Sequence, residues 1–132
     1  MIVDLIQFWV PIFGLIYLFF GLIILRHHEK KWLISSRFLG LSHALIILYH
    51  CIPYIIELYP NYNYMQKNTD QDIIINTISL SYFIVDTIHF FFFEINDFLM
   101  LLHHCVCFGY IGTGLYSGYG CFSFVVGLLF ES

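Results

Sequence analysis

The sequence predicts an all-α integral membrane protein, an antiparallel bundle of four transmembrane helices with a partial fifth helix at the C-terminus. Of the 132 residues, 60% are hydrophobic and 11% are charged, whereas about 25% of the residues of a soluble domain are charged. The hydrophobic residues gather into runs of about 20, which is long enough to cross a hydrocarbon core of about 30 Å. We expect a single membrane domain, residues 1–132, with spans at about 5–25, 38–59, 73–93 and 98–116 and a partial span at 120–131.

Each of the first two spans is an apolar run that contains one proline. Residues 5–25 carry no charge and include Pro11, which a membrane helix tolerates because neighbouring groups satisfy the freed carbonyl. A signal peptide would begin with a basic region, and none precedes this run, so we expect a retained span. Residues 38–59 form the second span, and Pro53 is expected to bend its far half.

The segment between these two spans, residues 26–37, holds most of the positive charge of the chain. The five basic residues are Arg26, Lys30, Lys31, Arg37 and, outside this segment, Lys67. Loops rich in Lys and Arg stay on the cytosolic side of a membrane. We therefore expect this loop on the cytosolic side, or on the matrix side of a mitochondrial membrane. The net charge of −4 and the lack of a basic face give no reason to expect a nucleic-acid partner.

The third span carries ionisable residues inside an apolar run. Tyr82, Asp86 and His89 fall on one helical stripe, and Asp86 is close enough to His89 along the helix for a hydrogen bond or an ion pair. An aspartate near a helix centre costs about 2.5–3.5 kcal/mol on insertion scales, and such residues usually face the interior of a bundle. This pattern predicts a polar site between helices.

The fourth span supplies the residues that we expect to meet this aspartate. The turn at 94–97 is so short that the third and fourth spans must be antiparallel neighbours. His103 lies about two turns after this turn and Asp86 about two turns before it. The side chains of Asp86, His103 and the adjacent His104 are therefore predicted to meet at a similar depth.

The last apolar run, residues 120–131, is about half a bilayer long as a helix. A carboxylate such as Glu131 at that depth is costly unless another subunit, an aqueous cavity or a thinned membrane receives it. We therefore expect other integral membrane subunits at this end, together with membrane lipids, as partners. The predicted interhelical or lipid-binding polar cluster consists of Tyr82, Asp86, His89, His103, His104 and Glu131.

No metal or other cofactor is expected. Cys105 and Cys107 lie beside the histidine pair, but on a helix only Cys107 can face a ligand together with His103 or His104. A histidine-ligated haem stays open as a third hypothesis, although hydrogen bonding between helices is the commoner use of such residues. Its candidate ligands are His43, His50, His89 and His103.

Four motifs in order give the chain a family resemblance. They are Trp32 with Ser36, Arg37 and His43 in KWLISSRFLGLSHALII, SYFIVD ending at Asp86, LLHH at His103 and His104, and a glycine-containing turn followed by Glu131 and Ser132. In order and spacing these motifs resemble the TLC-domain family over residues 32–132. That family includes ceramide synthases, translocon-associated TRAM proteins and plasma-membrane lipid regulators.

The resemblance implies a helical bundle around a lipid-binding cavity, in the endoplasmic reticulum for most members. In ceramide synthases, paired histidines act with two aspartates of the following helix to transfer a fatty acyl group from coenzyme A to a sphingoid amine. The histidine pair corresponds to His103 and His104. The aspartate pair is replaced by Glu131 and Ser132, so the sequence is nearer to the non-synthase branch.

Two functional hypotheses follow. The first is a non-catalytic, lipid-binding accessory subunit of a larger membrane complex, for example in the mitochondrial inner membrane. The alternative is an acyltransferase of ceramide-synthase type, in which His103 or His104 takes a proton from the attacking amine and Asp86 orients the imidazole. The endoplasmic reticulum and the mitochondrial inner membrane are both kept as locations.

Overall fold

Four long helices make up the computed structural model, which describes residues 1–58, 66–94 and 97–121. They are α1 (Ile2–Phe19), continued by the π-helical segment η1 (Phe20–Ile24), α2 (Lys31–Leu58), α3 (Asp70–Phe93) and α4 (Phe98–Ser117). All four are long and apolar enough to cross a membrane. The predicted all-α membrane fold is confirmed for these four spans. Nearly all of the predicted partial fifth span lies outside the described residues.

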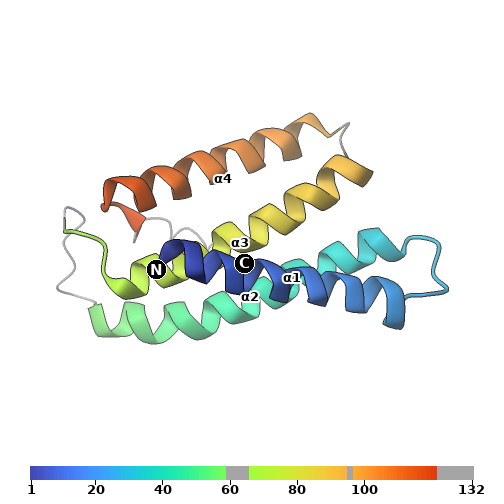
Figure 1. Cartoon of the computed structure of the whole chain (residues 1–132), viewed down its shortest axis with the longest axis horizontal. Coiled ribbons are helices and arrows are strands. Elements are labelled where there is room, and N and C mark those ends of the chain that lie inside the picture. The colour runs from blue at the N-terminus through green and yellow to red at the C-terminus, as the bar shows by residue number, and fades with distance from the viewer. Residues whose placement is uncertain (59–65, 95–96, 122–132) are drawn as a thin grey trace.

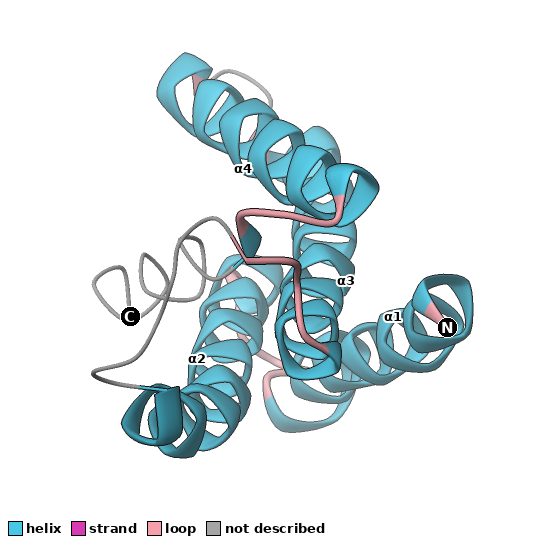
Figure 2. Cartoon of the chain, turned by 90° about the vertical axis from the view of Figure 1, so that its left-hand side faces the viewer, coloured by secondary structure: helices cyan, strands magenta, loops and turns pink. Residues whose placement is uncertain are grey.

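Helix α3 is the centre of the bundle. Successive helices run in opposite directions (Figure 1), and the view along the bundle shows α3 between α1, α2 and α4 (Figure 2). Each of these three helices packs against α3. Within the described part of the chain, no Cα atom of α2 comes within 8 Å of a Cα atom of α4. These two helices are therefore held at a distance from each other by the helix between them.

The second helix begins earlier than the sequence predicts. It starts at Lys31 rather than at residue 38, so only residues 25–30 connect it to the preceding helix and the predicted loop 26–37 is too long. The Lys31 ammonium lies 5.2 Å from the centre of the Trp32 ring. Long charged side chains can extend from a helix end toward water while their stems cover apolar surface. A charged residue therefore does not mark the end of the helix here.

The π-helical segment η1 receives Trp32 of α2. The Trp32 ring fits against Gly21, where a Cβ atom would lie 2.3 Å from the ring. The same ring stacks on Tyr17, with 5.5 Å between centroids, and on Phe93, at 6.2 Å. These contacts join α1, α2 and α3 at the end of the bundle where α2 begins.

Small polar side chains bring other helices close to α3. Thr77, Ser79 and Ser81 are fully buried. Thr77 Oγ1 donates to the carbonyl of Ile73 at 2.7 Å and Ser81 Oγ to that of Thr77 at 2.8 Å, so neither hydroxyl is left unsatisfied. Small residues allow backbones to approach closely in membrane proteins. The larger buried apolar residues around them include Phe13, Leu39, Ile47, Ile75 and Ile78.

The start of α4 is capped within the helix, and its end is bonded to the segment before α3. At its start, Asp97 caps the helix by accepting from the Met100 amide at 3.1 Å. At its end, Gly118 adopts the left-handed conformation, with φ of 77°. Asn68, just before α3, donates from Nδ2 to the Gly114 carbonyl at 2.8 Å. The bond from Asn68 holds the end of α4 next to the start of α3 and so limits the rotation of α4 about its axis.

Candidate functional site

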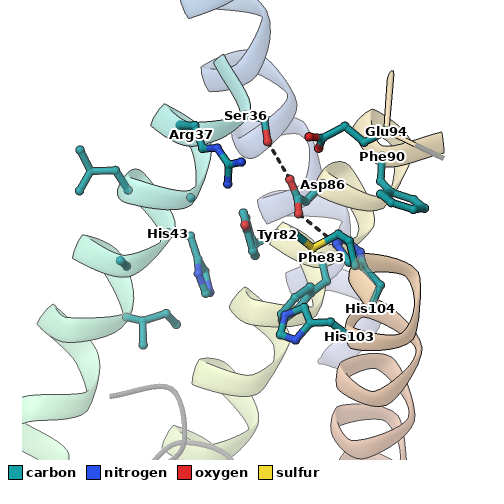
Figure 3. A pocket seen from close by; sticks show the side chains of 15 residues that line it. Ser36, Arg37, His43, Tyr82, Phe83, Asp86, Phe90, Glu94, His103 and His104 are labelled. Atoms are coloured by element: carbon teal, nitrogen blue, oxygen red, sulfur yellow. Dashed lines mark hydrogen bonds and ion pairs between the residues drawn. The ribbon is translucent and has the colours of Figure 1, made fainter. Parts of the chain in front are cut away.

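A cavity of about 410 Å3 lies between α2 and α4, with α3 as its floor. Its volume falls in the range of about 300–1,000 Å3 that is usual for small-molecule sites. Apolar side chains line part of it, namely Leu41, Ala44, Ile47, Phe83, Phe90 and Met100. Its polar lining consists of Ser36, Arg37, His43, Tyr82, Asp86, Glu94, His103 and His104. Figure 3 shows the labelled members of both sets around the cavity.

Asp86 is the residue at which three helices meet. Its Oδ1 atom accepts from Ser36 Oγ of α2 at 3.1 Å, and its Oδ2 atom lies 3.3 Å from His104 Nε2 of α4. Both contacts are drawn as dashed lines in Figure 3. Its side chain is 15% exposed. Of the histidine pair, the structure brings His104 into contact with Asp86.

His104 uses both of its ring nitrogens. Besides the contact of Nε2 with Asp86, Nδ1 lies 2.7 Å from Thr87 Oγ1. The neutral tautomer with the proton on Nε2 satisfies this arrangement, because it donates to the carboxylate and accepts from the threonine hydroxyl. The residue is 2% exposed. His104 therefore has no free nitrogen with which to take a proton from a bound molecule.

His103 lines the same cavity but is not bonded to Asp86. Its ring nitrogens lie 3.7 and 3.9 Å from the Sγ atom of Cys107, one turn further along α4. It is exposed, and its ring lies edge-on to that of His104, with 5.9 Å between centroids. A sulfur atom at this distance is at most a weak hydrogen-bond partner. Among the two histidines, His103 is therefore the one able to accept a proton.

His89 does not pair with Asp86, which corrects the sequence prediction. Its Nδ1 atom lies 2.7 Å from the Tyr17 hydroxyl of α1, and its Nε2 atom lies 3.5 Å from Glu94 Oε2. The two residues are three positions apart on α3, so their side chains leave the helix about 60° apart. Asp86 accordingly faces α2 and α4, whereas His89 faces α1.

Tyr82 lines the cavity beside Asp86, as the stripe on α3 predicts. Its ring stacks on that of His43 from α2, with 4.2 Å between centroids and 9° between planes. His43 Nε2 in turn lies 3.1 Å from Ser79 Oγ. The stacked pair closes the wall between α2 and α3 beside the polar residues.

The family of the chain follows from a comparison with protein-family models. Residues 5–132 match the model of the TLC domain. The chain belongs to the TLC-domain family. The match begins before the first sequence motif at Trp32 and so includes α1. No curated protein and no solved structure gives a match.

Membership of this family makes the chain a lipid-related, multi-pass membrane protein. In this TLC domain the histidine pair and the aspartate of the third helix lie around one cavity. Glu131, the last predicted member of the polar cluster, lies outside the described residues.

The described part of the TLC domain contains no group of three or more His, Cys, Asp or Glu side chains suited to a metal ion. Of the four histidines considered for haem, His43 and His103 line the cavity, whereas His50 and His89 do not. His43 and His89 each bond to another residue, as described above, and His50 Nδ1 lies 3.4 Å from Gln71 Nε2. His103 alone of the four is exposed.

Four residues of the site were absent from the predicted set. Ser36 and Arg37 were assigned to a loop, although both occur in the family motif. Thr87 and Glu94 gave no signal of their own in the sequence. Thr87 lies one position after Asp86, and Glu94 lies five positions after His89. The antiparallel turn at 94–97 is the signal that could have placed them, because it puts the end of α3 opposite the start of α4.

Proposed function

We propose that this TLC domain is a non-catalytic, lipid-binding membrane protein that takes a lipid into the cavity between α2 and α4. The observation that carries the proposal is the distribution of polarity in the cavity. Ser36, Arg37 and Glu94 lie toward the ends of their helices on the side of residues 25–30, whereas Ile47 and Ala44 lie further along α2. A lipid has the same arrangement, with a polar head near the membrane surface and a chain at greater depth.

The state of His104 supports a binding rather than a catalytic role. General base catalysis needs a ring nitrogen within reach of the proton to be removed. Both nitrogens of His104 are held by Asp86 and Thr87. In this arrangement the pair Asp86 and His104 fastens α4 to α3 and keeps the cavity wall in place.

A matched pair of tryptophan variants tests lipid binding. Ala44→Trp places an indole inside the cavity, whereas Leu45→Trp places it on the adjacent position, which is 60% exposed. After purification in a mild detergent, lipid mass spectrometry should find a bound lipid in the wild type and in Leu45→Trp, and much less in Ala44→Trp. Equal amounts of lipid in the two variants would contradict the proposal.

We further propose that the chain works as an accessory subunit beside other integral membrane proteins, in the endoplasmic reticulum or the mitochondrial inner membrane. Within the described residues α4 packs against α3 alone, so apolar side chains such as Phe98, Leu99 and Val106 remain exposed to lipid or to a partner. Native purification through a tag on this chain should recover partner subunits in constant ratio. Recovery of the chain alone would reject this role.

Acyl transfer by a ceramide-synthase type of mechanism is the second candidate, because His103 faces the cavity with a ring nitrogen that could accept a proton. In that reaction His103 would take the proton from a sphingoid amine as the nitrogen attacks the thioester carbonyl of an acyl-coenzyme A. The C–S bond would then break, and the protonated imidazole would return the proton to the leaving sulfur, giving the amide and free coenzyme A. Asp86 and His104 would then act as positioning residues. His103→Ala should abolish the activity while the fold persists, and an acyl transfer rate unchanged from wild type would eliminate this candidate.

A further inference from the structure

The cavity is lined by three charged side chains, Asp86, Glu94 and Arg37. The Asp86 carboxylate is engaged by Ser36 and His104, and the Glu94 carboxylate lies 3.5 Å from the ring of His89. Arg37 differs from both. Within the described part of the chain, no hydrogen bond or ion pair engages its guanidinium group.

Arg37 is exposed on the cavity side of α2, so its guanidinium group is accessible to a bound molecule. The residue lies in the second turn of α2, on the same side of the helix as Gly40 and Ala44 of the cavity wall. Figure 3 shows its guanidinium group directed into the space between α2 and α3. A guanidinium carries five N–H donors, remains charged at any physiological pH, and matches the geometry of phosphate or carboxylate oxygens in a bidentate manner.

Charge around this end of the cavity favours an anion. Residues 26–31, at or just before the start of α2, carry Arg26, Lys30 and Lys31 against one acidic residue, Glu29, so this segment contributes a net positive potential at the same end. Of the two carboxylates that line the cavity, Asp86 is already engaged by Ser36 and His104, whereas Glu94 lies 3.5 Å from the His89 ring without a hydrogen bond to it.

We propose that the cavity selects a single-chain lipid with an anionic phosphate head, and that Arg37 binds the phosphate oxygens. The inference rests on the lipid-binding function proposed above and adds the chemistry of the head group to it. The lipid chain lies along Leu41, Ala44 and Ile47, which follow Arg37 on α2 and line the cavity.

Native mass spectrometry in a nonionic detergent tests this selectivity with two lipids that share a palmitoyl chain. The wild type should bind palmitoyl lysophosphatidic acid at least about 10-fold more tightly than palmitoyl lysophosphatidylcholine, whose choline adds a cation. Arg37→Gln should weaken lysophosphatidic acid binding by about 10–100-fold, as expected for the loss of charge-assisted hydrogen bonds. Arg37→Lys, which keeps the charge without the planar fork, should give an intermediate loss.

Arg26→Gln is the matched control, because it removes the same charge from an exposed residue outside the cavity. It should retain nearly the wild-type affinity for lysophosphatidic acid. Thermal unfolding of Arg37→Gln should match that of the wild type, since no described contact is lost. A third probe, inorganic phosphate, should compete only weakly with the lipid. Competition by phosphate at the same concentration as the lipid would overturn the lipid part of the inference.

The outcomes separate this inference from the proposed function. Equal binding of the two lipids, with no change in Arg37→Gln, would refute the role of Arg37 and leave lipid binding intact. Absence of binding of either lipid to the wild type would refute the lipid-binding function itself. An equal loss of lysophosphatidic acid binding in Arg26→Gln and Arg37→Gln would indicate a general surface charge effect and would also refute the assignment.

Discussion

Replacing Asp86 with alanine removes the acceptor that joins α3 to both α2 and α4. The variant loses the bond from Ser36 at 3.1 Å and the contact with His104 at 3.3 Å. Hydrogen bonds between membrane helices contribute about 0.6 kcal/mol on average and at most about 1.7 kcal/mol. Two such contacts give an expected loss of about 1–3 kcal/mol in the free energy of unfolding. Unfolding in mixed micelles of increasing denaturing-detergent content measures this loss.

A double-mutant cycle with His104→Ala isolates the contact between α3 and α4. If the pair interacts as the geometry indicates, the cycle should return a coupling energy of about 0.6–1.7 kcal/mol. Glu57→Ala is the control, because it removes a carboxylate from an exposed position of α2; its effect should stay within about 0.5 kcal/mol. A coupling energy near zero would refute the interpretation of Asp86 and His104 as the pair that fastens α4.

Two further predictions concern packing and topology. Gly21→Ala should destabilise the fold by about 1–3 kcal/mol, because its Cβ would overlap the Trp32 ring. Gly14→Ala, with open space around it, should stabilise α1 by about 0.5–1 kcal/mol. Equal unfolding temperatures for the two variants would contradict the tight fit at Gly21. In sealed vesicles, a membrane-impermeant maleimide should label Lys30→Cys and Lys67→Cys from opposite sides, since these residues flank the two ends of α2. Labelling of both residues from one side would contradict the transmembrane assignment of α2.

Hydrophobicity alone located the spans, and polar helix ends limited its accuracy. Apolar runs define where lipid contacts a helix, but they do not define where the helix begins. The first turn of α3 is polar because a capping box forms between Thr69 and Asp72, with the Thr69 amide donating to the Asp72 carboxylate at 2.8 Å. The start of α2 at Lys31 also lies outside the apolar run, since charged residues at a membrane surface can remain helical. The π-helical segment η1 depends on contact with Trp32, which no local pattern reveals.

The polar site was predictable in part because an antiparallel turn relates positions on two helices. Residues about equally far from the turn at 94–97 lie at similar depth, and this argument correctly placed Asp86 beside the histidine pair. It could not choose between His103 and His104, because that choice depends on the rotation of α4 about its axis. The rotation is set by contacts distant from the site, such as the bond from Asn68 to the Gly114 carbonyl.

The charged residues of the cavity differ in whether other side chains engage them, and this difference underlies the proposal for Arg37. Helix α3 and the residue that follows it supply two carboxylates, Asp86 and Glu94, and each lies within 3.5 Å of a histidine ring. The Asp86 carboxylate accepts from Ser36 and is reached by His104, and a buried carboxylate costs less when donors reach it, so these contacts stabilise the bundle without any ligand. Arg37 is exposed and has no ion pair in the described chain, which is why we propose it as the residue that binds the phosphate. Fold stability and ligand selection are thereby assigned to different residues of one cavity.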